Sequence, residues 1–397
     1  MKTLPPKVWR LMLAFALMSA GSSMMVLIAG IIGTDIAPSP EQATLPMALV
    51  IVGIASMALP VGSLQTRFGR RKVFICFGLV AIFSAGLAAW ALSIHSFSLF
   101  CLSAYIMGGT MAATQQYRFA AIEAVPVEKA PIAASTILLG GLLAVFVGPE
   151  VAVAGRALLD TDFAGSFLLL LLVFALGTAL VASVGDSAQL RSDKRTLWQG
   201  MTLITSSPVL LLAASAAAIG FGVMTLVMTA TPITMHNHVG HSLSDTKLII
   251  QWHMAAMFLP SLVSGWLIAK LGYRVMMWLG ILSFAVCIVV AFIDTSFIHF
   301  WLSLVLLGIG WNFLFVSGTA LLGMGHSSEE RFSVQASNDF IVFSVQALAA
   351  LGSGWLLFNW QWHGVLWVAV PLLVAFTVFL LRTKAFASLQ KQHSSMI

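Results

Sequence analysis

Apolar runs of about 20 residues recur along the whole chain and limit its possible folds more than any other feature. Hydrophobic residues make up 59% of the 397 residues, and only 9% are charged, whereas soluble domains carry about 25% charged residues. A soluble fold would have too few charges to cover its surface, so lipid has to be the solvent. The length of the runs predicts membrane-spanning α-helices, because barrel strands are shorter and alternate in polarity.

The runs predict an all-α membrane protein with twelve spans and mostly short polar linkers. The longest polar linker, 185–207, carries two arginines, a lysine and an aspartate between positions 191 and 195. It divides the chain into an N-terminal six-helix bundle over 1–184 and a C-terminal six-helix bundle over 208–397 with a short tail. We expect spans at 11–33, 44–64, 73–94, 98–121, 132–153, 163–184, 208–232, 248–269, 275–293, 299–323, 337–358 and 363–382.

Basic residues predict the orientation of these spans. If the N-terminus is cytoplasmic, every Lys and Arg except Arg156 and Lys247 lies on the cytoplasmic side or in the cytoplasmic half of a span. An excess of Lys and Arg marks the cytoplasmic loops of membrane proteins. We therefore expect a multi-pass protein of the bacterial inner membrane with both termini in the cytoplasm. The net charge of +6 then reflects topology, and we expect no nucleic-acid partner.

Two loops of the first bundle recur in the second. The loop after the second span reads GSLQTRFGRR from Gly62 to Arg71, and the loop after the eighth reads GWLIAKLGYR from Gly265 to Arg274. Both glycines and the final arginine recur at one offset of 203 residues. The loops at 128–135 and 330–337 match at an offset of 202. Two matches at nearly one offset indicate duplicated six-helix halves, related by an axis along the membrane normal.

The loop from Gly62 to Arg71 resembles the signature loop between the second and third helices of the major facilitator superfamily. The resemblance extends over the whole chain through the spans, the repeat and the loop positions. It implies the major facilitator fold, with two six-helix pseudo-repeats that rock about a central site to give alternating access. The family usually has an aspartate where this sequence has Thr66, and we expect Asp339 to supply that charge. The gating residues implied here are Gly62, Arg67, Gly69, Arg70 and Arg71.

Three other segments carry finer resemblances. Gly148 and Pro149 in the fifth span are similar to the glycine–proline motif of drug–proton antiporters, although Ala144 and Ala152 replace expected glycines. This adds Gly148 and Pro149 to the expected gating residues. The segments 113–119 and 310–315 resemble those of a bacterial permease group in which riboflavin transport has been proposed. Efflux of drugs or metabolites and uptake of a riboflavin-like vitamin therefore both remain open.

Polar side chains in the fourth and tenth spans are the predicted substrate contacts. Gln115 and Arg118 share a helix face, with Gln116 beside them. A guanidinium next to an amide can hold a carboxylate or a planar polar ring, although Arg118 could instead reach the cytoplasmic surface. Trp311 and Asn312 suit a flat aromatic ring, by stacking and one hydrogen bond, or they serve packing.

Three ionisable residues are the predicted proton-coupling groups. Glu150 follows Pro149 in an apolar kink, where a carboxylic acid could carry a proton, or it lies near the outer surface and faces Arg156. His253 could titrate near neutral pH or be a neutral core histidine. Asp339 begins the eleventh span, where the helix dipole also favours an acid for structural reasons.

The expected function is secondary active transport of a small organic molecule, coupled to protons. The sequence contains no Walker motif, nucleophile elbow or His-Glu-x-x-His, so we do not expect an enzyme. A non-transporting sensor on the same fold and an intramembrane enzyme are the alternatives of a different class. We expect no cofactor and no metal, and a monomer whose partners are the substrate, protons and the lipid bilayer.

Overall fold

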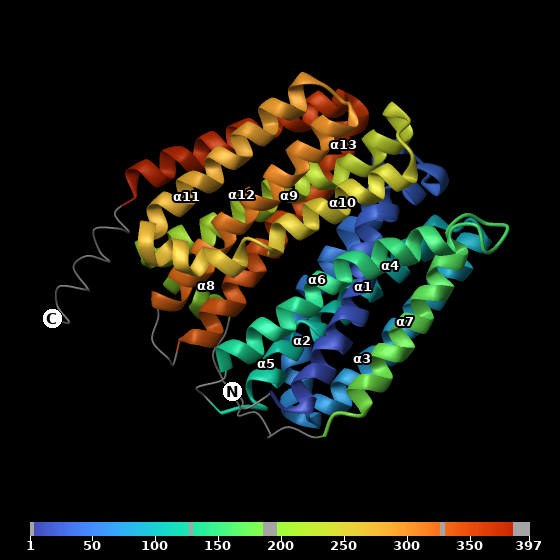
Figure 1. Ribbon diagram of the computed structural model, residues 1–397, viewed down its shortest axis with the longest axis horizontal. Helices are drawn as coiled ribbons and strands as arrows, with labels where there is room; N and C mark the ends of the chain where they lie inside the picture. The colour runs from blue at the N-terminus through green and yellow to red at the C-terminus, as the bar shows by residue number, and fades with distance from the viewer. Residues whose placement is uncertain (1–3, 127–129, 186–196, 326–329, 384–397) are drawn as a thin grey trace. The chain divides into compact units, whose positions relative to one another are not determined.

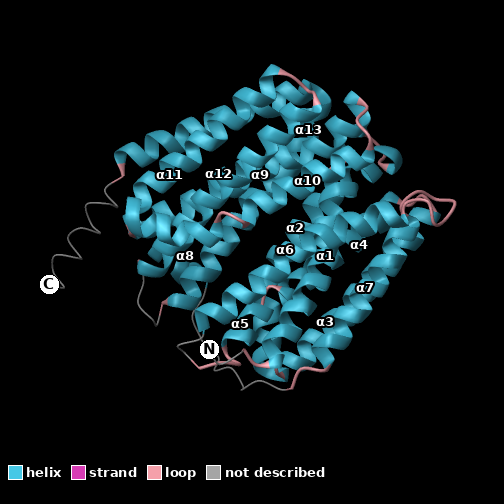
Figure 2. Ribbon diagram, in the orientation of Figure 1, coloured by secondary structure: helices cyan, strands magenta, loops and turns pink. Residues whose placement is uncertain are grey.

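The computed structural model describes residues 4–126, 130–185, 197–325 and 330–383. Every regular element within these ranges is a helix, and none is a strand (Figure 2). The predicted all-α class is confirmed. Helices suit a lipid solvent because they satisfy their backbone hydrogen bonds within one segment.

Contacts divide the chain into two compact units. Unit 1 contains the described residues of Met1–Ser192 together with His236–Gln251, and unit 2 contains those of Asp193–Met235 and Trp252–Ile397. The segment His236–Gln251 follows unit 2 residues in the sequence, yet its contacts are with unit 1. This division differs from the two predicted bundles mainly in that segment.

Unit 1 is organised around its first helix. Helix α1 buries most of its side chains and packs against α6 and α7, while α2 packs on α4 and α3 packs on α7 (Figure 1). Gly53 and Gly108 bring α2 and α4 close together, since a Cβ on either would collide with the backbone of the other helix. Small residues commonly allow such packing in lipid. The helices are α1 (Pro6–Ile36), α2 (Leu45–Phe68), α3 (Arg70–Ser93), α4 (Phe97–Thr114), α5 (Tyr117–Ile122), α6 (Ala130–Gly155) and α7 (Ala164–Ala182).

Unit 2 is organised in the same way around α9, which buries most of its side chains against α12 and α13. Helix α8 lies inside the predicted linker, and Gly200 brings it close to the backbone of α13 at Ser333. Helix α10 begins in unit 1 and ends in unit 2. The helices are α8 (Leu197–Ser206), α9 (Pro208–Ile233), α10 (Leu243–Phe258), α11 (Ser261–Ile293), α12 (Phe297–Met324) and α13 (Arg331–Arg382).

Nine helical stretches among the described residues are long and apolar enough to cross a membrane, and Leu139–Gly155 is a shorter apolar helix. One of the nine, Ser333–Arg382, has 50 residues, so as a straight helix it would be about 75 Å long and would far exceed a bilayer core of about 30 Å. Its backbone leaves helical geometry at Gln361 (φ 59°, ψ −171°), which separates two arms. The chain is thus a multi-pass membrane protein, and the number twelve stays a prediction.

The two repeated loops share one unusual backbone conformation. Gly69, between α2 and α3, has φ 83° and ψ 150°, and Gly272, inside α11, has φ 80° and ψ 161°. This region of φ/ψ space is open almost only to glycine. The offset seen in the sequence therefore corresponds to the same bend in the backbone of each unit.

We predict that Gly69→Ala and Gly272→Ala each lower the free energy of unfolding by about 1–3 kcal/mol, because alanine is strained in this conformation. No other atom lies within 4 Å of a Cβ built at either glycine, so steric contact does not contribute. Thermal unfolding of the purified protein in detergent measures the change.

Gly62→Ala and Gly265→Ala are the matched controls. They are related by the same repeat and have the same open space, but their backbones are helical. Alanine has a higher helix propensity than glycine, so these variants should be as stable as the parent or slightly more stable. An equal loss of stability in both pairs would contradict the backbone explanation.

Candidate functional site

The arginines of the signature loop bind groups inside unit 1. The Arg70 Nη2 atom lies 2.8 Å from Glu123 Oε1, and the Arg70 side chain is 6% exposed. Arg71 donates from Nη2 to the carbonyl oxygen of Ala182 at 2.7 Å, at the C-terminal end of α7. Helix C-termini attract cations. The loop is therefore held to the residue after α5 through the Glu123 carboxylate, and to α7 through a backbone carbonyl oxygen. The sequence pattern did not indicate Glu123.

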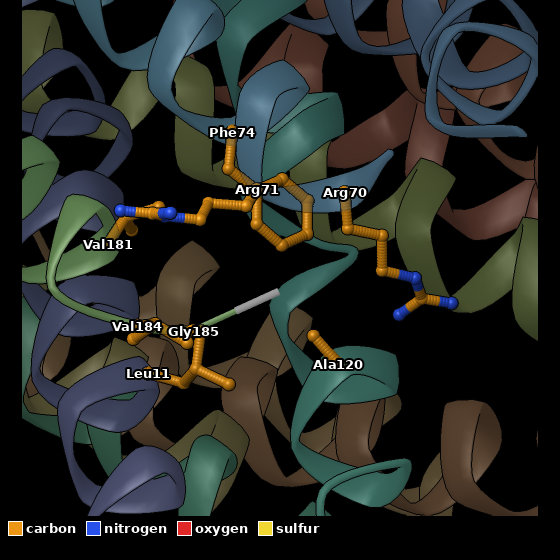
Figure 3. Close-up of a pocket in the computed structure, with 8 residues that line it drawn as sticks. All are labelled: Leu11, Arg70, Arg71, Phe74, Ala120, Val181, Val184 and Gly185. Atoms are coloured by element: carbon orange, nitrogen blue, oxygen red, sulfur yellow. The ribbon is translucent and has the colours of Figure 1, made fainter. Parts of the chain in front are cut away.

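Figure 3 shows these arginines beside a small cavity lined by apolar side chains such as Phe74 and Leu11. The two guanidinium groups extend in opposite directions, away from the centre of the cavity. Arg67 is exposed, and its guanidinium carbon lies 5.1 Å from the centre of the Phe68 ring. The Thr66 side chain lies outside what the structure describes.

The predicted substrate contacts of the fourth span lie at a break in the helix. Gln115 and Gln116 form the turn between α4 and α5, and Arg118 is in the first turn of α5. Gln115 and Arg118 are exposed, and the guanidinium carbon of Arg118 lies 4.7 Å from the centre of the Phe119 ring. Polar groups of this kind within a span are expected to face protein or water, which is compatible with the predicted contact to substrate.

Glu150 is in an ion pair. Its Oε1 atom lies 2.8 Å from Lys247 Nζ, and Gln251 donates to the same oxygen at 3.4 Å. The Glu150 side chain is 59% exposed and that of Lys247 is 18% exposed. The expected apolar surroundings of Glu150 are therefore wrong, and so is the expected pairing with Arg156, which binds Asp162. A role of Glu150 in coupling stays a prediction.

The glycine and proline before Glu150 shape the contact of α6 with α1. A Cβ on Gly148 would collide with α1 at Ala20 and Ser23. Pro149 lies inside α6, where it cannot donate a backbone hydrogen bond. The Ser23 hydroxyl donates to the carbonyl oxygen of Ala144 at 2.6 Å, in the turn before the proline. Gly148 thus allows a close contact between α6 and α1, and Ser23 adds a hydrogen bond between the two helices.

Asp339 lies deeper in its helix than the sequence predicted. Helix α13 begins at Arg331, so Asp339 is in the third turn instead of the first. The favourable effect of the helix dipole fades beyond the first turn, which makes the structural explanation for this acid wrong. Asp339 is exposed, and Asn338 donates to its Oδ1 at 3.3 Å.

Asn312 is fully buried, and its whole amide is engaged within unit 2. Its Nδ2 donates to the carbonyl oxygen of Met257 at 2.7 Å and to Ser261 Oγ at 2.6 Å, and its Oδ1 accepts from Ser264 Oγ at 2.8 Å. An amide group has two protons to donate, and both are used. Asn312 thus joins α12 to the end of α10 and the start of α11, and these contacts leave it no donor for a substrate.

His253 is also fully buried in unit 2. Its Nδ1 lies 2.7 Å from the carbonyl oxygen of Leu304, so Nδ1 carries a proton and donates it. Its Nε2 has no hydrogen-bond partner among the described residues. This arrangement matches the neutral core histidine that the sequence analysis left as an alternative.

Trp311 is part of a stack of aromatic rings. It is 4% exposed, and its ring lies parallel to that of Phe315, with 4.8 Å between centroids and 13° between planes. The two residues are one helical turn apart on α12. Phe221 of α9 packs edge-on against Trp311 at 5.1 Å and 88°. The predicted stacking partner of a substrate is thus covered by neighbouring phenylalanines, which the sequence pattern alone did not indicate.

The sequence is similar to those of known membrane transporters. The sequence profile of the Major Facilitator Superfamily matches residues 11–234 and 212–395. The chain is 34% identical over 379 residues to the riboflavin transporter RfnT of Brucella anthropi, covering 94% of this chain and 95% of that protein.

Solved structures share the fold at low sequence identity. A bacterial homologue of the lysosomal transporter Spinster superposes with a TM-score of 0.74 at 13% identity, over 96% of this chain and 97% of that one. The nucleoside transporter NupG gives a TM-score of 0.71 at 14% identity, over 94% of this chain and 99% of that one. The chain therefore belongs to the major facilitator superfamily, and it is a secondary transporter of a small organic molecule, not an enzyme.

Proposed function

We propose that this transporter carries riboflavin or a closely related flavin, driven by the proton gradient across the bacterial inner membrane. The observation that carries the proposal is the 34% identity, over 94% of the chain, to a protein named as a riboflavin transporter. Protein family alone would leave the substrate open, because one transporter fold serves many substrates.

The chemistry of a flavin fits the groups in the spans. Its fused ring is flat and carries carbonyl oxygens, which a guanidinium can bind in its plane. Arg118 supplies such a group, with Gln115 and Gln116 beside it. We propose these three residues as the polar part of substrate recognition.

Orientation follows from the basic residues. We propose that both termini are cytoplasmic, as the excess of Lys and Arg on that side supports. The N-terminal end of α1, where Lys7 and Arg10 bind the carbonyl oxygens of Gly185 and Ser183, then lies inside. The pair of Glu150 with Lys247 lies at the outer end. We also propose that the protein acts as a monomer.

Asp339 is the coupling group that we favour. It lies in the third turn of α13, beyond the reach of the helix dipole, and it is exposed. An acid within a span is costly in lipid and by default indicates function. Glu150 and His253 remain candidates, and His253 is fully buried in the core.

Purified protein in liposomes should accumulate riboflavin when a pH gradient is imposed, and a protonophore should abolish the accumulation. Reversing the gradient gives the direction of transport. Liposomes without protein are the control. Absence of riboflavin flux under either gradient would overturn the proposal. Transport of hydrophobic cationic dyes instead would favour the efflux function that the Gly148–Pro149 motif resembles.

We predict that Asp339→Asn abolishes gradient-driven accumulation but preserves exchange of riboflavin across the membrane, because the amide cannot take up a proton. Asp160→Asn is the control, since Asp160 is an exposed acid in the loop before α7. Both fluxes are measured in liposomes with labelled riboflavin. Full accumulation by the Asp339 variant would place the coupling proton elsewhere.

We propose further that Glu150 and Lys247 act as a pair that opens and closes the outer end. Exchange of the two charges tests this role. Glu150→Lys and Lys247→Glu alone should each slow transport several-fold, because like charges would face each other at a contact that is now 2.8 Å long. The double variant should recover most of the parental rate. A double variant that binds riboflavin but cannot couple to protons would instead show that Glu150 carries the proton.

A further inference from the structure

Three half-buried phenylalanines lie together on three different helices of unit 2. Phe221 of α9 is the central ring. Its centroid is 5.4 Å from that of Phe315 on α12, at 89°, and 6.4 Å from that of Phe343 on α13, at 63°. Edge-to-face contacts of this kind are favourable for aromatic rings. We call these three residues the phenylalanine cluster.

A rigid layer lies behind the phenylalanine cluster. The buried ring of Trp311 stacks on Phe315, as described above, and also meets Phe221 edge-on. Ala217, Ala218 and Val342 form a buried core against which Phe221 and Phe315 pack. Rings supported in this way have fixed orientations, so the surface that they leave open is already arranged for a ligand.

The central ring of the phenylalanine cluster lies on a helix that is covered by its neighbours. Helix α9 is described from end to end, and none of its large apolar side chains is exposed. Helices α11 and α13 differ, since Leu282 of α11 is 58% exposed and Leu348 of α13 is 70% exposed. The accessible part of Phe221 therefore lies on a helix that has no exposed large apolar side chain.

An ionisable group lies close to this surface. Asp339 precedes Phe343 by four residues on α13, so the two side chains share a helix face. A ligand ring over Phe343 would have this carboxylate within one helical turn. Apolar rings with a polar group at one edge suit a fused heteroaromatic ring, which is flat and carries hydrogen-bonding atoms on its rim.

We propose that the phenylalanine cluster is the subsite that binds the flat fused ring of the substrate. The ring would stack on Phe315 and extend its parallel pair with Trp311, and it would meet Phe221 at the edge. The inference rests on the proposed function for the identity of the substrate as a flavin. The subsite itself requires only a flat heteroaromatic ligand, and a sugar or a linear polyol does not fit it.

Binding to the full-length protein in lipid nanodiscs tests this subsite. The probes are riboflavin, lumichrome, which has a fused ring without the ribityl chain, and ribitol, which is the chain alone. We expect the parent to bind the first two and not the third, with quenching of flavin fluorescence on stacking. Phe315→Leu, Phe221→Leu and Phe343→Leu should each weaken both ring ligands about three- to tenfold.

Two other variants separate stacking from folding. Phe315→Tyr keeps the ring and should bind nearly as well as the parent. Phe379→Leu removes a half-buried phenylalanine of α13 outside the cluster and should leave affinity unchanged. If a leucine variant does not fold, the remaining leucine variants and the tyrosine variant still decide the question.

Each outcome has a separate meaning. Parental affinity for the ring ligands in all folded leucine variants overturns the subsite, and so does a parent that binds neither ring ligand. A parent that binds lumichrome with the expected dependence on the phenylalanines, but neither binds nor transports riboflavin, contradicts the proposed substrate and supports the subsite.

Discussion

Lipid cannot form hydrogen bonds, and the placement of polar groups in this protein follows from that constraint. A buried polar group without a partner is costly, so an amide or hydroxyl inside a span is expected to have a partner in its own helix or in another, or a functional reason. Asn312 meets the requirement completely, with three hydrogen bonds that join α12 to the α10–α11 region. Ser23 of α1 meets it by donating to the Ala144 carbonyl oxygen of α6, in the turn before Pro149. Polar residues inside the spans therefore serve helix packing as well as transport.

The charges serve a different purpose from the buried amides. Arg70 with Glu123 fastens the signature loop within unit 1, and Lys247 with Glu150 binds the start of α10 to α6. Arg70 is 6% exposed, but Glu150 is 59% exposed, and an exposed ion pair such as that of Glu150 is worth only up to about 1 kcal/mol. That is enough to change a balanced two-state equilibrium several-fold without locking it. A transporter that alternates between states needs contacts of this moderate strength at the ends of its helices.

Proximity of Asp339 to the phenylalanine cluster would connect substrate to proton. Asp339 and Phe343 of the cluster lie on one face of α13, one turn apart. Two ligands that bind so close together influence each other's affinity, and this coupling is reciprocal. A proton on Asp339 would change the charge next to the bound ring, and the ring would change the solvation of the acid. The proposed subsite would thus give the proposed proton coupling a physical basis within one unit.

The sequence by itself determined the helical class, the membrane setting, the family and the repeat, because each depends on local composition or on a fixed offset. Even the bend at Gly69 and Gly272 follows from a residue type that alone tolerates the conformation. Only the tertiary structure decided which of the polar residues have partners within the protein, and which partners these are. Glu150 meets Lys247 almost a hundred positions away, Asn312 is fully bonded, and Asp339 sits in the third turn of α13. The phenylalanine cluster likewise brings together rings from three helices, and nothing in the apolar sequences of these helices distinguishes those rings from other phenylalanines. Contacts between distant segments leave no periodic pattern in the sequence. These partners therefore become evident only in the folded structure, where packing brings them together.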